Sequence, residues 1–259
     1  MIRKHGKRGA LPRNFSKAAP TLENYFRVEP LPRPTPVVDR LTGVTVPMYA
    51  NDRLGDCTCA GAGHGIGCMS AFLGTEALFT DTEIIKMYSA VSGYDPATGA
   101  NDNGAELADV CKYLVTTGIT DTNGKLHKLA AWAEIEQFNN LTLLESVLYN
   151  FGTVYCAFQL PDDALDVFDA GQPWTNISQA PDPNEGHCMV IQYSAVQDKA
   201  IWNDETLVTW AAGQKANRAW MRKYLCESIV MVSEDYVNAN GTNISGLNLQ
   251  QMITDAQGL

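Results

Sequence analysis

The sequence predicts an α+β protein, because helical patterns come first along the chain and strand patterns follow them. Four helices are predicted between residues 57 and 152, and four strands between residues 153 and 233. With 259 residues, 45% of them hydrophobic and 19% charged, the chain can bury one large core or two lobes. No apolar run reaches the ~18 residues that span a bilayer, so no membrane partner is expected.

Residues 1–36 are predicted to form an extended, basic arm. Seven of the twelve prolines lie in the first 50 residues, and the run PLPRPTP disfavours regular helix. Residues 1–40 hold nine Lys and Arg against three Asp and Glu, 9 − 3 = +6, so the rest of this −10 chain carries −16. An acidic body argues against a nucleic-acid partner. The arm is expected to contact an acidic surface, on its own body or on a neighbouring subunit.

The first predicted helix, residues 57–73, is apolar or small on all sides, which is typical of a buried central helix. Its glycines each cost roughly 1 kcal/mol relative to alanine, so close packing against neighbouring backbone is expected to compensate. Capping residues and periodicity predict the other three helices at 80–94, 104–118 and 140–152.

The predicted strands are β-branched or alternating runs. They cover residues 153–160, 187–196, 206–212 and 227–233. This order predicts a helical lobe over about residues 51–150 and a β lobe over about 151–233. Residues 234–259 are expected to form a C-terminal tail with a short helix.

The stretch NDRLGDCTCAGAGHGIGC, residues 51–68, gathers three cysteines and one histidine. Cys57 stands at the predicted start of the buried helix, where unpaired backbone N–H groups favour a thiolate. A nucleophilic thiolate also needs a base from elsewhere in the fold. His187 begins a predicted strand at the junction of the lobes and is the preferred base. Of the others, His5 lies in the arm and His127, near lysines, is expected at the surface.

A metal site is the alternative interpretation of this stretch. Cys57, Cys59, His64 and Cys68 have the spacing C-x-C-x4-H-x3-C. On one helix Cys59 points away from the other three, and no C-x-x-C pair is present. No metal or cofactor is therefore expected, and His64 is assigned to helix packing. An odd count of seven cysteines in no compact framework predicts free thiols and a reducing compartment.

The order of these segments resembles the papain-like cysteine protease family over residues 37–233. VVDRLTGVTVPMYANDRLGDCTCA is similar to the family's mature N-terminal region, with Gly55-Asp56-Cys57 where the family has Gly-Ser-Cys. Asn51 stands six residues before Cys57, at the position of the family's oxyanion-hole glutamine. NDNGAELADVCKYLVTTGI is similar to the family's Asn-Gly-Gly segment and the following helix. The resemblance implies that Gly55, Asn103, Gly104 and Ala105 line a substrate cleft.

The second half of the chain carries the rest of the resemblance. GHCMVIQY is similar to the histidine-bearing strand, and TLVTWAA followed by WMRKY to the Asn-Ser-Trp-Gly region and final strand. Trp210 would then shield the catalytic pair. Val208 stands where the family has its orienting asparagine, which leaves Asn203 and Thr209 as candidate orienters. Asn51 is one methylene shorter than the glutamine it replaces.

The resemblance implies a two-lobed fold, with a buried nucleophile helix in a helical left lobe and an antiparallel, β-barrel-like right lobe. It also implies a cysteine peptidase or amidase that attacks a peptide or protein substrate through an acyl-enzyme. The alternative is a papain-fold structural protein that docks through residues 1–36 to another copy or to virion proteins. An NDRxGDC opening with a VTWxx close is also familiar from bacteriophage genomes.

The arm is shorter than the family's helical propeptides, so it is predicted to serve assembly rather than inhibition. The basic N-terminus is followed by no apolar signal core, so a cytoplasmic location is expected, with virion association under the alternative.

Overall fold

The main sheet of the protein is antiparallel and runs in the order β4-β9-β5-β6-β7-β8. The computed structural model describes residues 3–14, 19–26, 31–35, 37–195, 204–238, 241–243 and 245–258. The strands are β4 (Leu129–Glu134), β5 (Val154–Gln159), β6 (Gly186–Ala195), β7 (Asp204–Thr209), β8 (Ala212–Asn217) and β9 (Leu225–Ser233). A further strand, β1 (Val37–Asp39), pairs with the far end of β6. Among the described strands no pairing joins β4 to β8, so the sheet stays open.

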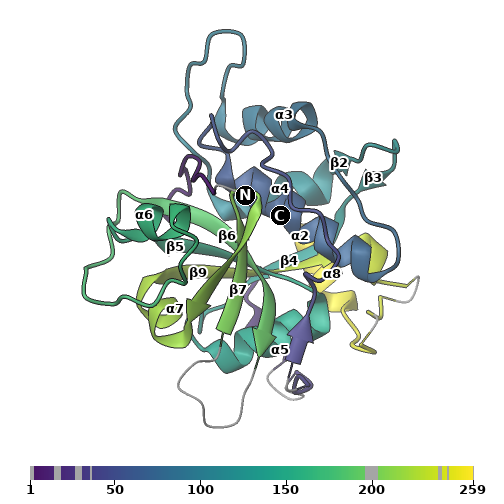
Figure 1. The fold of residues 1–259 in the computed structure, drawn as a ribbon. Helices are drawn as coiled ribbons and strands as arrows, with labels where there is room; N and C mark the ends of the chain where they lie inside the picture. Colours follow the sequence, from purple (N-terminus) through teal and green to yellow (C-terminus); the bar gives the residue numbers. More distant parts are fainter. Residues whose placement is uncertain are drawn as a thin grey trace.

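The helices confirm the predicted α+β class (Figure 1). Helix α2 (Cys57–Phe72) lies between the sheet, where it packs on β6, and the helices α3 (Asp81–Ser92) and α4 (Leu107–Thr116). Helix α5 (Leu141–Phe151) packs on β5, β6 and β9, and α8 (Gln250–Gln257) packs on β4. Shorter elements are α1 (Leu22–Tyr25), β2 (Ile119–Thr120), β3 (Leu126–His127), α6 (Ala164–Asp169), α7 (Arg218–Tyr224) and the 3-10 turn η1 (Glu234–Tyr236). No helix in the described ranges is long and apolar enough to cross a membrane.

Besides the short β1, two strands of the sheet were not predicted. Strand β4 is buried along its whole length, but its LAAWAE sequence has no β-branched residue. Strand β8 has the polar sequence AGQKAN and is held by pairing with β7. In both cases the neighbouring strands, rather than local propensity, decide the conformation.

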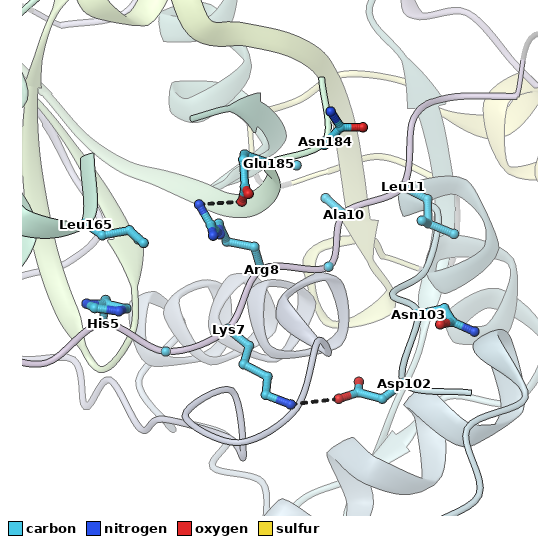
Figure 2. Close-up of a pocket in the computed structure, with 13 residues that line it drawn as sticks. His5, Lys7, Arg8, Ala10, Leu11, Asp102, Asn103, Leu165, Asn184 and Glu185 are labelled. Atoms are coloured by element: carbon cyan, nitrogen blue, oxygen red, sulfur yellow. Dashed lines mark hydrogen bonds and ion pairs between the residues drawn. The ribbon is translucent and has the colours of Figure 1, made fainter. Parts of the chain in front are cut away.

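The N-terminal arm packs on the protein's own body. Residues 5–11 line one side of a pocket, and body residues such as Asp102 and Glu185 line the other (Figure 2). Further along, the amide of Glu134 donates to the Pro20 carbonyl at 2.8 Å, and Asn150 Nδ2 donates to the Pro32 carbonyl at 3.0 Å. The helical turn α1 interrupts the predicted extended chain and buries Leu22.

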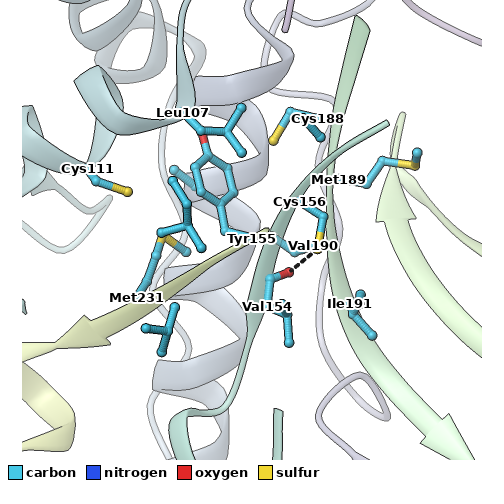
Figure 3. Close-up of a cluster of buried hydrophobic side chains, with 14 of the residues drawn as sticks. Leu107, Cys111, Val154, Tyr155, Cys156, Cys188, Met189, Val190, Ile191 and Met231 are labelled. Atoms are coloured by element: carbon cyan, nitrogen blue, oxygen red, sulfur yellow. Dashed lines mark hydrogen bonds between the residues drawn. The ribbon is translucent and has the colours of Figure 1, made fainter. Parts of the chain in front are cut away.

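Helix α2 is buried from Cys57 to Ser70, as its composition predicts. Its glycines permit close approach on several sides, because a Cβ on Gly61 would meet Cys188 Sγ at 2.9 Å. The Tyr155 hydroxyl donates to the Thr58 carbonyl at 2.7 Å. Tyr155, Cys188 and Leu107 belong to the packed cluster beside α2 (Figure 3). Helix α2 is therefore packed closely against β5 and β6.

His127 is buried, so the prediction that it lies at the surface is wrong. Its Nε2 lies 3.2 Å from Asp121 Oδ2 and its Nδ1 lies 2.9 Å from Asp235 Oδ2. Because side chains alternate along a strand, β3 points Leu126 outward and His127 inward. The two carboxylates provide the polar partners that a buried imidazole requires.

Candidate active site

Cys57 is the first residue of α2 and is almost completely buried. The preceding loop is tightly wound, with Tyr49 at φ 54° and Ala50 at φ 66°. The amide of Cys188 donates to Cys57 Sγ at 3.4 Å, so the start of β6 meets the start of α2. Cys188, which follows His187 in the chain, therefore contacts the Cys57 thiol through its backbone amide.

His187 is fully buried and has one polar partner. Its Nε2 lies 2.6 Å from Thr209 Oγ1, while its Nδ1 has no hydrogen-bond partner among the described residues. The indole of Trp210 stacks on the imidazole, with ring centres 4.2 Å apart and planes at 24°. Of the two orienters considered from the sequence, Thr209 contacts the histidine, and Asn203 lies outside the described residues.

The turn between β7 and β8 contains backbone strain. Trp210 has φ 44° and Ala211 has φ 57°, in the left-handed region that glycine normally occupies. Such residues typically cost about 1–3 kcal/mol each and persist where the surrounding structure imposes them. Here Trp210 packs edge-on against Phe168 at 4.9 Å and face-on against His187. The strained hairpin therefore positions both the Trp210 indole and the Thr209 hydroxyl against the imidazole of His187.

Asn51 lies in the loop before α2 and is 2% exposed. Its Nδ2 lies within hydrogen-bond distance of the carbonyls of Lys7 (3.1 Å) and Leu54 (3.0 Å) and of Asp56 Oδ1 (3.2 Å). Trp210 Nε1 also donates to the Lys7 carbonyl, at 3.2 Å. Despite its shorter side chain, Asn51 therefore reaches a peptide carbonyl that lies in the cleft.

The opposite wall of the cleft is the loop from Asp102 to Ala105. Gly104 has φ 85°, and its amide donates to the Tyr88 hydroxyl at 2.9 Å. Asp102 Oδ1 accepts from the Tyr88 hydroxyl and from the Gly55 amide, each at 2.8 Å. Asp102 thus ties this wall to the loop that carries Cys57.

Residues 3–14 of the arm are here called the cleft segment, and residues 5–11 of this segment line the pocket beside these walls. Ala10 forms a parallel bridge with Ala105. The backbone hydrogen bonds that seat the segment are Lys7 N to Asn51 O (2.6 Å), Gly9 N and Ala10 N to Gly186 O (3.1 and 3.0 Å), Leu11 N to Ala105 O (3.0 Å) and Ala105 N to Gly9 O (2.9 Å). The segment therefore joins both sides of the cleft at the catalytic residues.

Glycines of the cleft segment and of the body make this close fit possible. A Cβ on Gly9 would clash with the Gly55 backbone, and one on Gly6 would clash with the Asn51 carbonyl. From the body side, a Cβ on Gly186 would clash with the carbonyl of Ala10. These close approaches require residues without side chains at the three positions.

The Cys57 thiol and the His187 imidazole are both neutral in this buried site. Burial raises the pKa of the Cys57 thiol to about 12, and the nearby Asp56 acts in the same direction, against hydrogen bonds from the Cys188 and Gly9 backbone. Burial, together with the Arg8 guanidinium, lowers the pKa of His187 to about 3. At neutral pH both groups are uncharged, so the thiolate required for nucleophilic attack is absent.

Asp56, directly before the nucleophile, is fully buried. Burial raises its pKa to about 8, with Asp102 and Asp81 adding to the effect and the hydrogen bond from Asn51 opposing it. The folded state therefore retains a proton that the unfolded state releases between pH ~4 and ~8. Asp56 therefore lowers the free energy of unfolding progressively as pH rises through this window.

Asp56→Asn is expected to stabilise the protein increasingly from pH 4 to pH 8, by an amount on the order of a few kcal/mol at pH 8. The amide keeps an acceptor for Asn51 and removes the titration. Urea unfolding of both proteins at several pH values measures the difference, in which other titrating groups cancel. A difference that stays constant with pH would contradict a raised pKa.

The other residues of the cysteine-histidine stretch lie apart from the site. His64 Nε2 lies 2.7 Å from the Pro47 carbonyl, and its ring packs on Tyr49 at 5.0 Å. Cys59 and Cys68 are buried free thiols in α2. These contacts are structural, and they do not converge on a common point.

Three acidic residues of the site were not singled out from the sequence: Asp56, Asp102 and Glu185. Each stands next to a predicted site segment, because Asp56 precedes Cys57, Asp102 precedes Asn103, and Glu185 lies two residues before His187. That adjacency was the available signal. It does not distinguish an acidic side chain that enters the cleft from one in solvent.

Comparison with solved structures identifies the fold as that of papain-like cysteine proteases. Xylellain, a cysteine protease from Xylella fastidiosa, matches with a TM-score of 0.61 and 13% identity over 89% of this chain and 97% of its own. Digestive procathepsin L2 proteinase from the larval midgut of Tenebrio molitor matches with a TM-score of 0.64 and 12% identity, over 88% of this chain and 78% of its own. The ragweed pollen allergen Amb a 11, a cysteine protease solved in its proform, matches with a TM-score of 0.56 and 15% identity, over 84% and 72%.

No protein-family model matches the sequence, and no curated protein matches it. The similarity is therefore one of fold, because at 12–15% identity most individual residues differ. The predicted papain-like architecture is confirmed, and the activity has to be argued from the site itself.

Proposed function

We propose that the protein is a cysteine peptidase whose N-terminal arm holds it in a latent state. The observation that carries the proposal is the grouping of Cys57, His187 and Thr209 at the start of α2, β6 and the β7–β8 hairpin. The fold shared with cysteine proteases supports the same class of reaction. The substrate is a peptide or protein.

In the proposed reaction, His187 Nδ1 takes the proton of the Cys57 thiol. The tautomer with a proton on Nε2 donates to Thr209 Oγ1 and leaves the Nδ1 lone pair unpaired for this purpose. The thiolate then forms a C–S bond to the substrate carbonyl carbon, and the carbonyl oxygen becomes an oxyanion. The Asn51 amide, which reaches a peptide carbonyl of the cleft segment, is placed to donate to it.

Collapse of this intermediate breaks the C–N bond, and the leaving amine takes the proton from His187. Water then attacks the thioester with His187 as general base, which releases the acid and restores the thiol. Trp210 covers the imidazole and limits the access of other water molecules.

Latency is proposed because the cleft segment fills the position of a substrate. Its hydrogen bonds use the carbonyl of Gly186, both backbone groups of Ala105 and the amide of Asn51. Two of the structural neighbours were solved as a proform and a proenzyme, respectively. The sequence-based prediction that the arm serves assembly rather than inhibition is not supported, because this part of the arm lies in its own cleft.

The alternative of an inactive assembly protein has no observation in its favour. Phage origin, virion association and oligomer formation stay predictions from the sequence.

The activity is tested with the full-length protein. Gly9→Leu should unseat the cleft segment and allow hydrolysis of fluorescein-labelled casein, with the wild type at least about tenfold slower. Gly9→Leu combined with Cys57→Ser should be inactive because the nucleophile is lost. Hydrolysis that persists in the double variant would show that another residue, or a contaminant, is responsible. A folded Gly9→Leu protein that cleaves nothing and leaves Cys57 unreactive to a peptidyl epoxide would contradict the proposal.

A further inference from the structure

Two cations of the cleft segment, Lys7 and Arg8, each meet a carboxylate that lines the pocket. Lys7 and Arg8 point to opposite sides of the segment, Lys7 towards the Asp102 wall and Arg8 towards the loop before β6 (Figure 2). The ion pairs are Lys7 Nζ to Asp102 Oδ2 at 3.1 Å and Arg8 to Glu185, and His5 Nδ1 lies within hydrogen-bond distance of Asp169 Oδ2 at 2.8 Å. These two charges of the basic arm are therefore matched by acidic residues within the cleft.

Asp102 is held in place independently of Lys7. Its Oδ1 accepts from the Gly55 amide and the Tyr88 hydroxyl, which leaves Oδ2 to face the cleft. Burial acts to raise its pKa, but these hydrogen bonds and the Lys7 charge outweigh it and hold the pKa below the usual range. Its side chain is 18% exposed. Asp102 is therefore a fixed, partly buried anion that does not need the arm to position it.

Glu185 stands at the other edge of the same site. Its carbonyl accepts from the Leu160 amide at 3.1 Å and its own amide donates to the Asp182 carbonyl at 3.1 Å, so its backbone is anchored at both groups. It lies two residues before His187, and Arg8, its partner, is close enough to act on the charge of that imidazole. A cation paired with Glu185 therefore lies next to the catalytic base.

Both carboxylates line a pocket of about 420 Å³ that follows the cleft segment. The body residues of this pocket are Asp102, Asn103, Leu165, Asn184, Glu185 and Gly186. A chain that displaces the segment must lie along the same body residues. If it carried apolar or acidic side chains there, two partly buried carboxylates would lose their counter-charges, which disfavours such a chain.

We propose that Asp102 and Glu185 are specificity-determining residues that select peptides with cationic side chains next to a glycine. The proposal rests on the peptidase function above and names its substrate class: Lys- or Arg-containing segments with a small residue over Cys57. The cleft segment, with the sequence HGKRGAL, is the internal example of such a ligand. The net charge of −10 adds a long-range attraction for basic substrates.

The first test measures binding and needs no turnover. The receptor is full-length protein carrying Gly9→Leu and Cys57→Ser, and the probe is a fluorescein-labelled peptide of residues 3–14. The wild-type peptide should bind, and peptides with Lys7→Ser or Arg8→Ser should each bind at least about tenfold more weakly at low salt.

Substitutions of Asp102 and Glu185 in the receptor then show which carboxylate is responsible for each loss of peptide binding. Asp102→Asn keeps an oxygen for Gly55 and Tyr88 but removes the charge, so it should bind wild-type and Lys7→Ser peptides equally well. Glu185→Gln should likewise bind the wild-type and Arg8→Ser peptides equally well. Asp162→Asn, at an exposed carboxylate outside the pocket, should preserve the full discrimination. Discrimination that survives Asp102→Asn and Glu185→Gln would overturn the proposal.

The second test separates specificity from activity. Active Gly9→Leu protein should cleave internally quenched peptides that carry Lys or Arg beside glycine with a kcat/KM at least about tenfold above that for matched Ser or Glu peptides. Asp102→Asn and Glu185→Gln should reduce this preference. Equal cleavage of all peptides would overturn the specificity and leave the peptidase function intact. Discriminating binding without any cleavage would reject the peptidase function and keep the recognition.

Discussion

Gly9→Leu in the full-length protein is expected to raise the rate at which iodoacetamide modifies Cys57 by about three orders of magnitude at pH 7. In the covered site burial raises the Cys57 pKa to about 12, whereas an unperturbed thiol has a pKa of about 8.5. The fraction of thiolate at pH 7 then changes from roughly 10⁻⁵ to a few per cent. The leucine side chain produces this change because a Cβ at position 9 already clashes with the Gly55 backbone.

Mass spectrometry counts the label on Cys57, and the six other cysteines, all of them free thiols, supply the internal reference. Leu11→Ala is the matched control, since the Leu11 side chain is 40% exposed and its backbone hydrogen bond remains. If Gly9→Leu fails to fold, Lys7→Glu with Arg8→Glu tests the same point through charge repulsion. A peptide of residues 3–14, added in excess, should slow the reaction again. Equal labelling of Cys57 in wild-type and folded variants would show that the arm does not protect it.

His187→Ala, made in the Gly9→Leu protein, is expected to reduce kcat/KM for peptide hydrolysis by about 10³-fold or more, because the thiol loses its base. Thr209→Val should reduce it by roughly 10- to 100-fold. Valine has nearly the shape of threonine but leaves His187 Nε2 without its 2.6 Å partner. Thr209 acts through the histidine and is therefore a positioning residue.

A pH profile distinguishes this role from general destabilisation. Thr209→Val should shift the acid limb of kcat/KM, which reports the histidine in the free enzyme, and Thr209→Ser should restore both rate and profile. Thr206→Val, on the same strand, serves as the structural control. A Thr209→Val enzyme with unchanged rate and profile would mean that another group orients His187.

Much of the fold follows from local pattern. The buried helix α2 was predicted because small and apolar residues surround it, and the strands β5, β6, β7 and β9 because their side chains suit a buried sheet. Strand β4 was missed because its alanine-rich sequence has no β-branched residue and is a strand through its pairing with β9 at the edge of the sheet. Propensity is local, whereas strand pairing depends on residues far apart in the chain.

The same division applies to the site. Cys57 and His187 were singled out because a thiol at a helix start needs an imidazole from another element. Asn203 and Thr209 could not be ranked, because the geometry of a strained hairpin decides which side chain reaches the imidazole. That geometry depends on Trp210 packing between His187 and Phe168, a tertiary contact.

The sequence by itself determined that the chain has a basic, glycine-containing arm, an acidic body and a cysteine at the start of a buried helix, because these are properties of composition and spacing. Only the tertiary structure decided where the arm lies. Its contacts join residues 5–11 to segments near residues 51, 102 and 185, and no local pattern encodes pairing over such separations. The predicted acidic surface is the cleft of the chain itself, where burial of the thiol and imidazole keeps both groups neutral.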